Sequence, residues 1–306
     1  MTPTQFVHSQ GIDLAVYTWG TASPQKPTIV LVHGYPDTAS VWGATAEQLA
    51  EHYFVVAYDV RGAGHSGIAK HRAEYDLAYL VQDLAAVLDV VSPQQAVHLV
   101  GHDWGSIQSW EAVTTERLQG RIASYTTISG PSLDHAGHWI ARRLKSGSLT
   151  QILQVLRPLL HSWYVAMFHL PLIAPSLWRV FGKWGPVLLA KIEGITGASV
   201  SPTQVQDGVH GIQLYRANFR NRVCKPQVRT TNLPVQLIVL QRDHFMIPEI
   251  WEDLPQWVPN LWRRDFNAGH WLPLSHPRLL ADWVAEFITF VETQQASPAL
   301  KLARVM

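Results

Sequence analysis

The stretch Ala96–Glu111, with the sequence AVHLVGHDWGSIQSWE, decides the fold that we expect. An apolar run ends in Gly101, and Gly105 follows four residues later at the start of a segment compatible with a helix. This is the pattern of a strand, a sharp turn and a helix, in which the two glycines let the residue between them, Asp103, stand above a sheet. A carboxylate in that place predicts a nucleophile that forms an ester intermediate without a base to activate it. The alternative is that Asp103 only caps the following helix.

Length and composition narrow the class of protein. The 306 residues fit one α/β domain with an insertion; 47% of them are hydrophobic and only 15% are charged. The formal net charge is +1 and no basic cluster is present, so we expect no nucleic-acid binding. The single cysteine, Cys224, and the lack of a signal peptide in residues 1–10 predict a cytoplasmic location. No uninterrupted apolar run has membrane-spanning length, so we expect no stable membrane insertion.

Strand and helix patterns alternate along most of the chain. We expect strands at 5–9, 12–19, 28–33, 54–58, 97–100, 122–128, 234–240 and 262–266, and helices at 41–51, 75–91, 105–116 and 277–291. The predicted class is α/β, with a mostly parallel central sheet and helices on both faces. Residues 133–227 show only short apolar helices broken by proline and glycine, which predicts a helical cap inserted into a core of residues 1–132 and 228–306. The tail, 297–306, is expected to be frayed.

Tryptophan is unusually frequent in the predicted cap. Trp139, Trp163, Trp178 and Trp184 lie close together in the sequence. They either fill a core or line an apolar, aromatic pocket for a small molecule.

Two loops after predicted strands carry further candidates. In His33–Asp37 a glycine and a proline bracket Tyr35, so its backbone N–H is predicted to point into a cavity, although a plain turn would give the same pattern. Paired with the N–H of Trp104, it would stabilise negative charge on an oxygen. Asp59, Arg61 and His65 are expected to form a structural polar network near the site.

Three groups follow predicted strands in the order nucleophile, acid and histidine: Asp103, Asp243 and His270. Open α/β sheets bind ligands at the carboxyl ends of their strands, so we expect these side chains to meet there as a catalytic triad. Taken singly, Asp243 could cap a turn and His270 could be an ordinary packing residue. The histidines lack paired ligand spacing and the glycines lack a dinucleotide-binding spacing, so no metal and no cofactor is expected.

The motifs identify a family. The chain resembles α/β-hydrolases of the epoxide hydrolase and haloalkane dehalogenase group over nearly its whole length, through His33–Pro36, Asp59–Ser66, Gly101–Gly105, Asp243 and Gly269–Trp271. The resemblance implies the α/β-hydrolase fold with its cap. It also implies a substrate pocket that includes His33, Pro36, Trp163, Phe168 and Trp271.

Two cap tyrosines favour the epoxide hydrolases within this group. Tyr164 begins a Tyr-x-x-x-Phe-x-x-Pro pattern that ends at Pro171, and Tyr215 lies in a Leu-Tyr-Arg-x-Asn segment, both of which are similar to the proton-donor motifs of that subgroup. A departing alkoxide needs a proton donor, whereas a halide leaves as a stable anion. Either tyrosine could instead be an ordinary buried residue of an amphipathic helix.

A finer likeness concerns Ser129–Trp139 and Ser162–Tyr164. Both resemble the hydrolase half of bacterial proteins that join an epoxide-hydrolase-like domain to a short-chain dehydrogenase, and this chain would be a free-standing version. The expected reaction opens a small apolar epoxide to a vicinal diol through an ester on Asp103, which water activated by His270 and Asp243 then hydrolyses. The alternatives are a dehalogenase and a non-catalytic protein that binds a small ligand. The oligomeric state is open, with a homodimer as one option.

Overall fold

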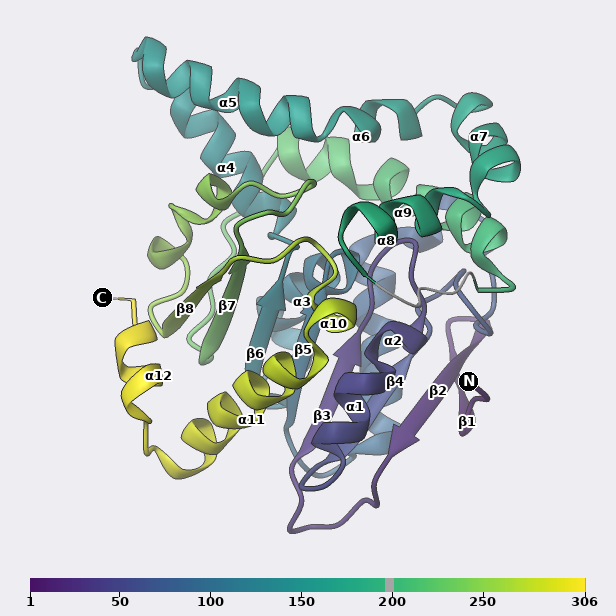
Figure 1. Ribbon diagram of the computed structural model, residues 1–306, viewed down its shortest axis with the longest axis vertical. Coiled ribbons are helices and arrows are strands. Elements are labelled where there is room, and N and C mark those ends of the chain that lie inside the picture. Colours follow the sequence, from purple (N-terminus) through teal and green to yellow (C-terminus); the bar gives the residue numbers. More distant parts are fainter. Residues whose placement is uncertain (196–200, 306) are drawn as a thin grey trace.

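A central sheet of eight strands organises the molecule (Figure 1). The computed structural model describes residues 1–195 and 201–305; residues 196–200 of the predicted cap and Met306 of the predicted tail lie outside this range. The strands are β1 (Gln5–Ser9), β2 (Ile12–Trp19), β3 (Thr28–Val32), β4 (Phe54–Tyr58), β5 (Val97–His102), β6 (Ile122–Ile128), β7 (Val235–Leu240) and β8 (Leu261–Phe266). Each coincides with a predicted strand to within a few residues.

The sheet is mostly parallel, as predicted. Its strand order is β1-β2-β4-β3-β5-β6-β7-β8, and only β2 runs antiparallel to its neighbours. Strand β5 lies between β3 and β6, with Val32 opposite Gly101 and His102 opposite Ile128. The carboxyl ends of these three strands therefore meet at one edge of the sheet, which is where the candidate site lies.

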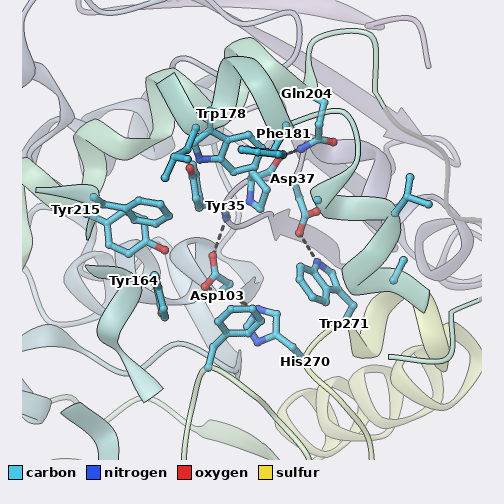
Figure 2. Close-up of a pocket in the computed structure, with 18 of the residues that line it drawn as sticks. Tyr35, Asp37, Asp103, Tyr164, Trp178, Phe181, Gln204, Tyr215, His270 and Trp271 are labelled. Carbon is cyan, nitrogen blue, oxygen red and sulfur yellow. Dashed lines mark hydrogen bonds and ion pairs between the residues drawn. The ribbon is translucent and has the colours of Figure 1, made fainter. Parts of the chain in front are cut away.

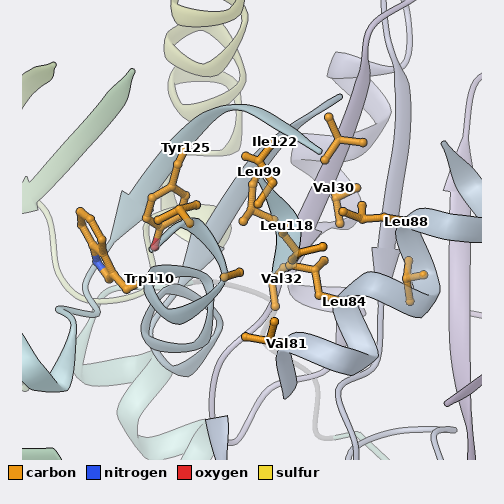
Figure 3. Packing of buried hydrophobic residues seen from close by; sticks show 14 of the residues in the cluster. Val30, Val32, Val81, Leu84, Leu88, Leu99, Trp110, Leu118, Ile122 and Tyr125 are labelled. Carbon is orange, nitrogen blue, oxygen red and sulfur yellow. The ribbon is translucent and has the colours of Figure 1, made fainter. Parts of the chain in front are cut away.

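Helices cover both faces of the sheet, which confirms the predicted α/β architecture. The helices of the core are α1 (Gly43–Leu49), α2 (Leu77–Val91), α3 (Trp104–Val113), α10 (Leu272–Ser275), α11 (Pro277–Thr293) and α12 (Pro298–Ala303). Short 3-10 helices are η1 (Ala39–Trp42), η2 (Arg72–Tyr75), η3 (Glu116–Leu118), η4 (Pro248–Trp251) and η5 (Leu254–Gln256). The apolar run of β3 is continuous because helices cover both faces of this strand. Val30 and Val32 pack with α2 and α3, as Figure 3 shows, whereas Ile29 and Leu31 pack with α1 and α11 on the other face.

Between β6 and β7, the described residues form six helices that lie over the carboxyl ends of the strands (Figure 1). They are α4 (Leu133–Leu144), α5 (Leu149–His161), α6 (Trp163–Phe168), α7 (Ile173–Phe181), α8 (Gly185–Ile192) and α9 (Gln204–Cys224). Among the described residues, no helix has both the length and the apolar character needed to cross a membrane. These helices form the roof of the site.

The tail differs from its prediction. Residues 298–303 form helix α12, which Ser297 caps by accepting a hydrogen bond from the N–H of Leu300. The Leu300 side chain is fully buried against Trp262 and Phe287, and the guanidinium of Arg304 lies 4.2 Å from the Trp262 ring centroid. The frayed tail was a wrong prediction because burial of one leucine stabilises by about 1.5–3 kcal/mol. That contact is with residues distant in the sequence.

The residues of the predicted polar network, Asp59, Arg61 and His65, form two separate sets of contacts. Asp59, directly after β4, accepts hydrogen bonds from the Tyr17 hydroxyl at 2.8 Å and from the backbone N–H of His65 at 2.9 Å. Arg61 instead forms a buried two-pronged pair with Asp83 of α2, both distances being 2.6 Å. The two acids therefore hold the loop after β4 in separate ways, and the single network was a wrong prediction.

Candidate active site

Asp103 occupies the turn between β5 and α3. Its backbone has φ 52° and ψ −122°, a positive φ that residues with side chains rarely adopt. The turn requires glycine at position 105, because a Cβ there would lie 2.0 Å from the carbonyl oxygen of Val32. The Asp103 side chain makes no capping hydrogen bond to α3, so the capping alternative is wrong. The carboxylate points into a cavity instead.

The loop after β3 contacts this carboxylate directly. The backbone N–H of Tyr35 donates to Oδ1 of Asp103 at 2.7 Å, which Figure 2 shows as a dashed line. Glycine at position 34 permits the approach, since a Cβ there would lie 2.4 Å from the same oxygen. The N–H of Tyr35 thus points where the sequence predicts. The second oxygen, Oδ2, lies 3.9 Å from Nε2 of His270.

His270 and Asp243 complete the predicted group of three. Nδ1 of His270 lies 3.0 Å and 3.1 Å from the two carboxylate oxygens of Asp243. Asp243 Oδ1 also accepts hydrogen bonds from the backbone N–H groups of Phe245 and Met246 at 2.8 Å and 3.0 Å. Asp243 therefore orients the ring so that Nε2 faces Asp103, the arrangement of a nucleophile, a base and an orienting acid.

The charges of these groups are coupled. Burial raises the pKa of Asp103 to about 6, although the charge of His270 and the N–H groups of Tyr35 and Trp104 oppose that rise. Burial also disfavours the charged form of His270, but Asp243, Asp103 and Asp37 together raise its pKa to about 9. Burial acts on Asp243 too, yet the charge and hydrogen bond of His270 hold its pKa below its usual value. At neutral pH, Asp103 is therefore ionised and faces a protonated His270.

The two predicted cap tyrosines lie beside Asp103 on one side of the cavity (Figure 2). Tyr164 comes from α6 and Tyr215 from α9, and their ring centroids are 6.0 Å apart. Burial and the charges of Asp103 and Asp243 raise the pKa of Tyr164 above its usual value. Burial, Tyr164 and Asp103 do the same for the pKa of Tyr215. Both hydroxyls therefore carry their protons at neutral pH and can donate them to an oxygen bound near Asp103.

A cavity of about 320 Å³ joins the sheet edge to the cap. Besides Asp103, His270 and the two tyrosines, its walls include Tyr35, Pro36, Asp37, Met167, Phe168, Leu177, Trp178, Phe181, Gln204, Phe245 and Trp271. Most of these side chains are apolar, as in small-molecule sites generally. Pro36, Phe168 and Trp271 thus lie where the sequence predicts pocket residues.

Two other residues predicted to line the pocket, His33 and Trp163, lie outside the cavity. His33 is fully buried beneath the loop, where Nε2 accepts the N–H of Val60 at 2.9 Å and Nδ1 lies 2.8 Å from the carbonyl of Gly34. It holds the loop and does not line the cavity. Trp163 is 65% exposed, because its neighbour Tyr164 takes the inward-facing position on the short helix α6. Neither residue is a pocket residue.

The other three tryptophans of the predicted cap differ in where their side chains lie. Trp178 lines the cavity and packs at 5.8 Å from the Tyr35 ring, whereas Trp139 is fully buried outside it and Trp184 is exposed. Pocket lining therefore holds for only one of the four.

Several residues of the site carry no strong signal in the sequence. Asp37 accepts a hydrogen bond from Nε1 of Trp271 at 3.0 Å, and burial raises its pKa to about 7. Its place directly after the His33–Pro36 motif was the one available clue. Phe245 packs 4.9 Å from the His270 ring, and Glu193, next to α8, brings a buried carboxylate close to Gly269. The position of Glu193 depends on how the cap meets the core, which no local pattern encodes.

The described residues contain no group of three histidine, cysteine or acidic side chains placed to hold a metal ion. The polar groups of the cavity are instead a carboxylate, an acid–histidine pair and two phenols. This set suits attack by a carboxylate on carbon, proton donation to an oxygen, and later hydrolysis of an ester.

Comparison with known proteins agrees with this geometry. Residues 27–154 match the model of the α/β-hydrolase fold family. The chain is 36% identical over 280 residues to the human protein named epoxide hydrolase 4, covering 86% of this chain and 72% of the relative. It superposes on the crystal structure of a Bacillus megaterium epoxide hydrolase in complex with an inhibitor, with a TM-score of 0.73 and 18% identity over 93% of this chain and 100% of the other. The fold and these matches place the chain in the α/β-hydrolase class.

The chain belongs, within that class, to the epoxide hydrolase family. It is also 35% identical over 302 residues to a Mycobacterium tuberculosis protein named probable oxidoreductase EphD, and this match covers 96% of this chain. The chain spans about half of that relative, 51% of its length. The term oxidoreductase belongs to the name of that longer protein.

Proposed function

We propose that this protein hydrolyses an apolar epoxide to a vicinal diol through a covalent ester on Asp103. One observation carries the proposal: the phenols of Tyr164 and Tyr215 line the same cavity as the carboxylate of Asp103 and the ring of His270. An epoxide must be attacked at carbon and protonated at oxygen, and these groups supply both functions.

In the first step, Oδ2 of Asp103 attacks an epoxide carbon. The carbon–oxygen bond of the ring breaks, and the epoxide oxygen takes a proton from Tyr164 or Tyr215, whose raised pKa values keep them protonated until then. Oδ2 is the nucleophilic atom because Oδ1 is held by the N–H of Tyr35. The product of this step is a hydroxyalkyl ester of Asp103.

In the second step, His270 must be neutral. The ester no longer carries the Asp103 charge that helps to raise the pKa of His270, so the ring gives its proton to the phenolate left by the first step. His270 then removes a proton from water, which attacks Cγ of the ester. Asp243 keeps the ring oriented and stabilises its positive charge.

Oδ1 then carries the negative charge of the tetrahedral intermediate. The N–H of Tyr35 donates to this atom, and we assign the N–H of Trp104, which also acts on the Asp103 carboxyl, as the second donor. Such donors are worth roughly 3–4 kcal/mol of transition-state stabilisation each. Collapse breaks the bond between Cγ and the former Oδ2, and this oxygen takes the remaining proton of the attacking water as it leaves in the diol. Asp103 is then ionised and His270 protonated, as before the first step.

The function is tested by turnover of a panel of styrene-type, aliphatic and fatty-acid epoxides, with the diol measured by chromatography and Asp103→Ala as the inactive control. We expect diol from at least one apolar epoxide and no halide from a bromoalkane. Halide release that survives Tyr164→Phe would show a dehalogenase instead. Tight binding of these epoxides without turnover would show a non-catalytic binding protein.

A further inference from the structure

Most of the large hydrophobic side chains that the described structure exposes to solvent lie between residues 149 and 192, on α5 to α8 and the segments joining them. They are Leu149, Leu153, Leu156, Leu160, Trp163, Leu170, Leu172, Ile173, Val180, Phe181, Trp184, Val187, Leu188 and Ile192, and we call this set the cap face. Monomeric soluble proteins rarely expose so much apolar surface in one segment unless it is a site of interaction.

The cap face has helical order. On α5 the exposed leucines fall at positions 149, 153, 156 and 160, which share one side of a helix, while Val155 is buried on the other side. An apolar stripe of this kind normally faces a protein core, but here it faces solvent. Figure 1 shows α5, α6 and α7 along the outer edge of the cap, away from the sheet.

The charge of the same segment has one sign. Residues 149–192 contain no aspartate or glutamate but four cationic side chains, of which Arg157 pairs with Glu249 of the core. The other three, Arg179, Lys183 and Lys191, are exposed and form no ion pair within the described part of the chain. Apolar side chains with tryptophan among them, interspersed with cations only, match the chemistry of an anionic membrane surface.

The cavity opens on this face. Phe181 and Val187 line the cavity and are also 58% and 42% exposed, so its mouth lies between α7 and α8. Trp184 and Lys183 sit in the turn that joins these two helices. A surface bound around Trp184 would therefore meet the mouth of the cavity.

We propose that the cap face docks on the surface of a lipid bilayer that contains anionic lipids, with the cavity mouth directed at the lipid. Exposed leucine and tryptophan side chains would enter the boundary between headgroups and acyl chains, and Arg179, Lys183 and Lys191 would contact lipid phosphates. A second copy fits this face less well, because a two-fold interface would place the cations of one copy near those of the other. The proposal does not depend on the proposed function, since docking can be measured without any substrate.

Vesicle flotation with the full chain tests the proposal. We expect the protein to float with vesicles of phosphatidylglycerol and phosphatidylcholine in about a 3:7 ratio, and at least about tenfold less with phosphatidylcholine alone. Raising NaCl from about 0.1 M to about 1 M, which shortens the screening length from about 10 Å to about 3 Å, should weaken the binding.

Matched variants locate the surface. Trp184→Gln with Leu188→Gln should reduce flotation about tenfold or more, whereas Phe6→Gln with Leu302→Gln, which changes two exposed apolar residues of the core, should leave it unchanged. Replacing Arg179, Lys183 and Lys191 together by glutamine should also reduce flotation about tenfold or more. None of these residues belongs to the catalytic groups. An unchanged midpoint of thermal unfolding would show that each variant is folded.

The orientation is tested with an environment-sensitive dye on a single cysteine in a Cys224→Ser background. A dye attached through Trp184→Cys should shift to shorter wavelength on anionic vesicles, and one attached through Leu302→Cys should not. Equal shifts at the two positions, or equal flotation of the apolar pair variants, would overturn the proposal. A wild type that stays off vesicles but forms dimers, which Trp184→Gln with Leu188→Gln converts to monomers, would assign the cap face to a second copy.

Discussion

The sheet edge and the cap contribute to the site in different ways. At the sheet edge, backbone geometry places the groups: Asp103 sits in a strained turn after β5, and the N–H of Tyr35 after β3 holds one of its oxygens at 2.7 Å. In the cap, side-chain packing places them: the Tyr215 ring lies 4.8 Å from both the Trp104 and Phe168 rings. The comparison teaches that the proposed covalent chemistry would depend on the turns of the core. The proposed proton donation would depend on how the cap helices pack over the core.

His270→Gln should have the largest effect of the predictions made from this comparison. The variant loses the base for the second step but keeps Asp103, so kcat should fall by about 10³-fold or more while the ester accumulates. Losing the His270 charge also raises the pKa of Asp103 above about 6, so the reaction is best run near pH 8. Mass spectrometry should show one substrate mass added to the peptide that carries Asp103.

The matched control for this variant is His8→Gln, which changes an exposed histidine far from the site. It should turn over normally and carry no adduct. An unmodified Asp103 in an inactive His270→Gln variant would contradict the order of the two steps.

Loss of one cap phenol should have a smaller effect. Tyr164→Phe or Tyr215→Phe removes one of two donors, so kcat should fall by about 10–100-fold, and the double variant should fall further than either single variant. Steady-state kinetics on the best epoxide measures this. Full activity in the double variant would show that the cap tyrosines do not donate the proton.

The pH dependence tests the sheet edge alone. Asp103 attacks only when ionised, and its pKa is raised to about 6, so kcat/KM should fall about tenfold per pH unit below that value and level off above it. Asp37, with a pKa raised to about 7, is the competing source of such a limb, and Asp37→Asn should leave the limb near pH 6 in place. A profile that stays flat down to pH 5 would be incompatible with a carboxylate nucleophile of raised pKa.

The smallest effects should come from the walls of the cap. Trp178 lines the cavity whereas Trp163 is exposed, so Trp178→Leu should raise KM about threefold to tenfold and Trp163→Leu should change it less than about twofold. The comparison uses one substrate without lipid, by initial rates. Equal effects of the two substitutions would contradict the placement of Trp178 in the cavity wall and of Trp163 outside it.

Local patterns predicted the core better than the cap. The β-branched run of β3, the glycines around Asp103 and the residues after β7 and β8 identify strand ends, and parallel strands bring those ends together without further information. The cap tyrosines came from motifs, but the direction of Trp163 depends on the packing of the six-residue helix α6. His33 turned inward to accept the N–H of Val60, which only the folded loop reveals. Burial of Leu300 likewise depends on a distant surface, so the tail was mistaken for a frayed end.

The central claim is that Asp103 becomes an ester before water enters the reaction. A single turnover with excess enzyme in heavy-oxygen water tests it, followed by mass analysis of the diol and of the peptide that carries Asp103. Because water attacks Cγ of the ester, the label should appear on the Asp103 carboxylate, and the diol of the first turnover should remain unlabelled. Label found directly in that diol, with none on Asp103, would mean that water opens the epoxide itself and would contradict the covalent route.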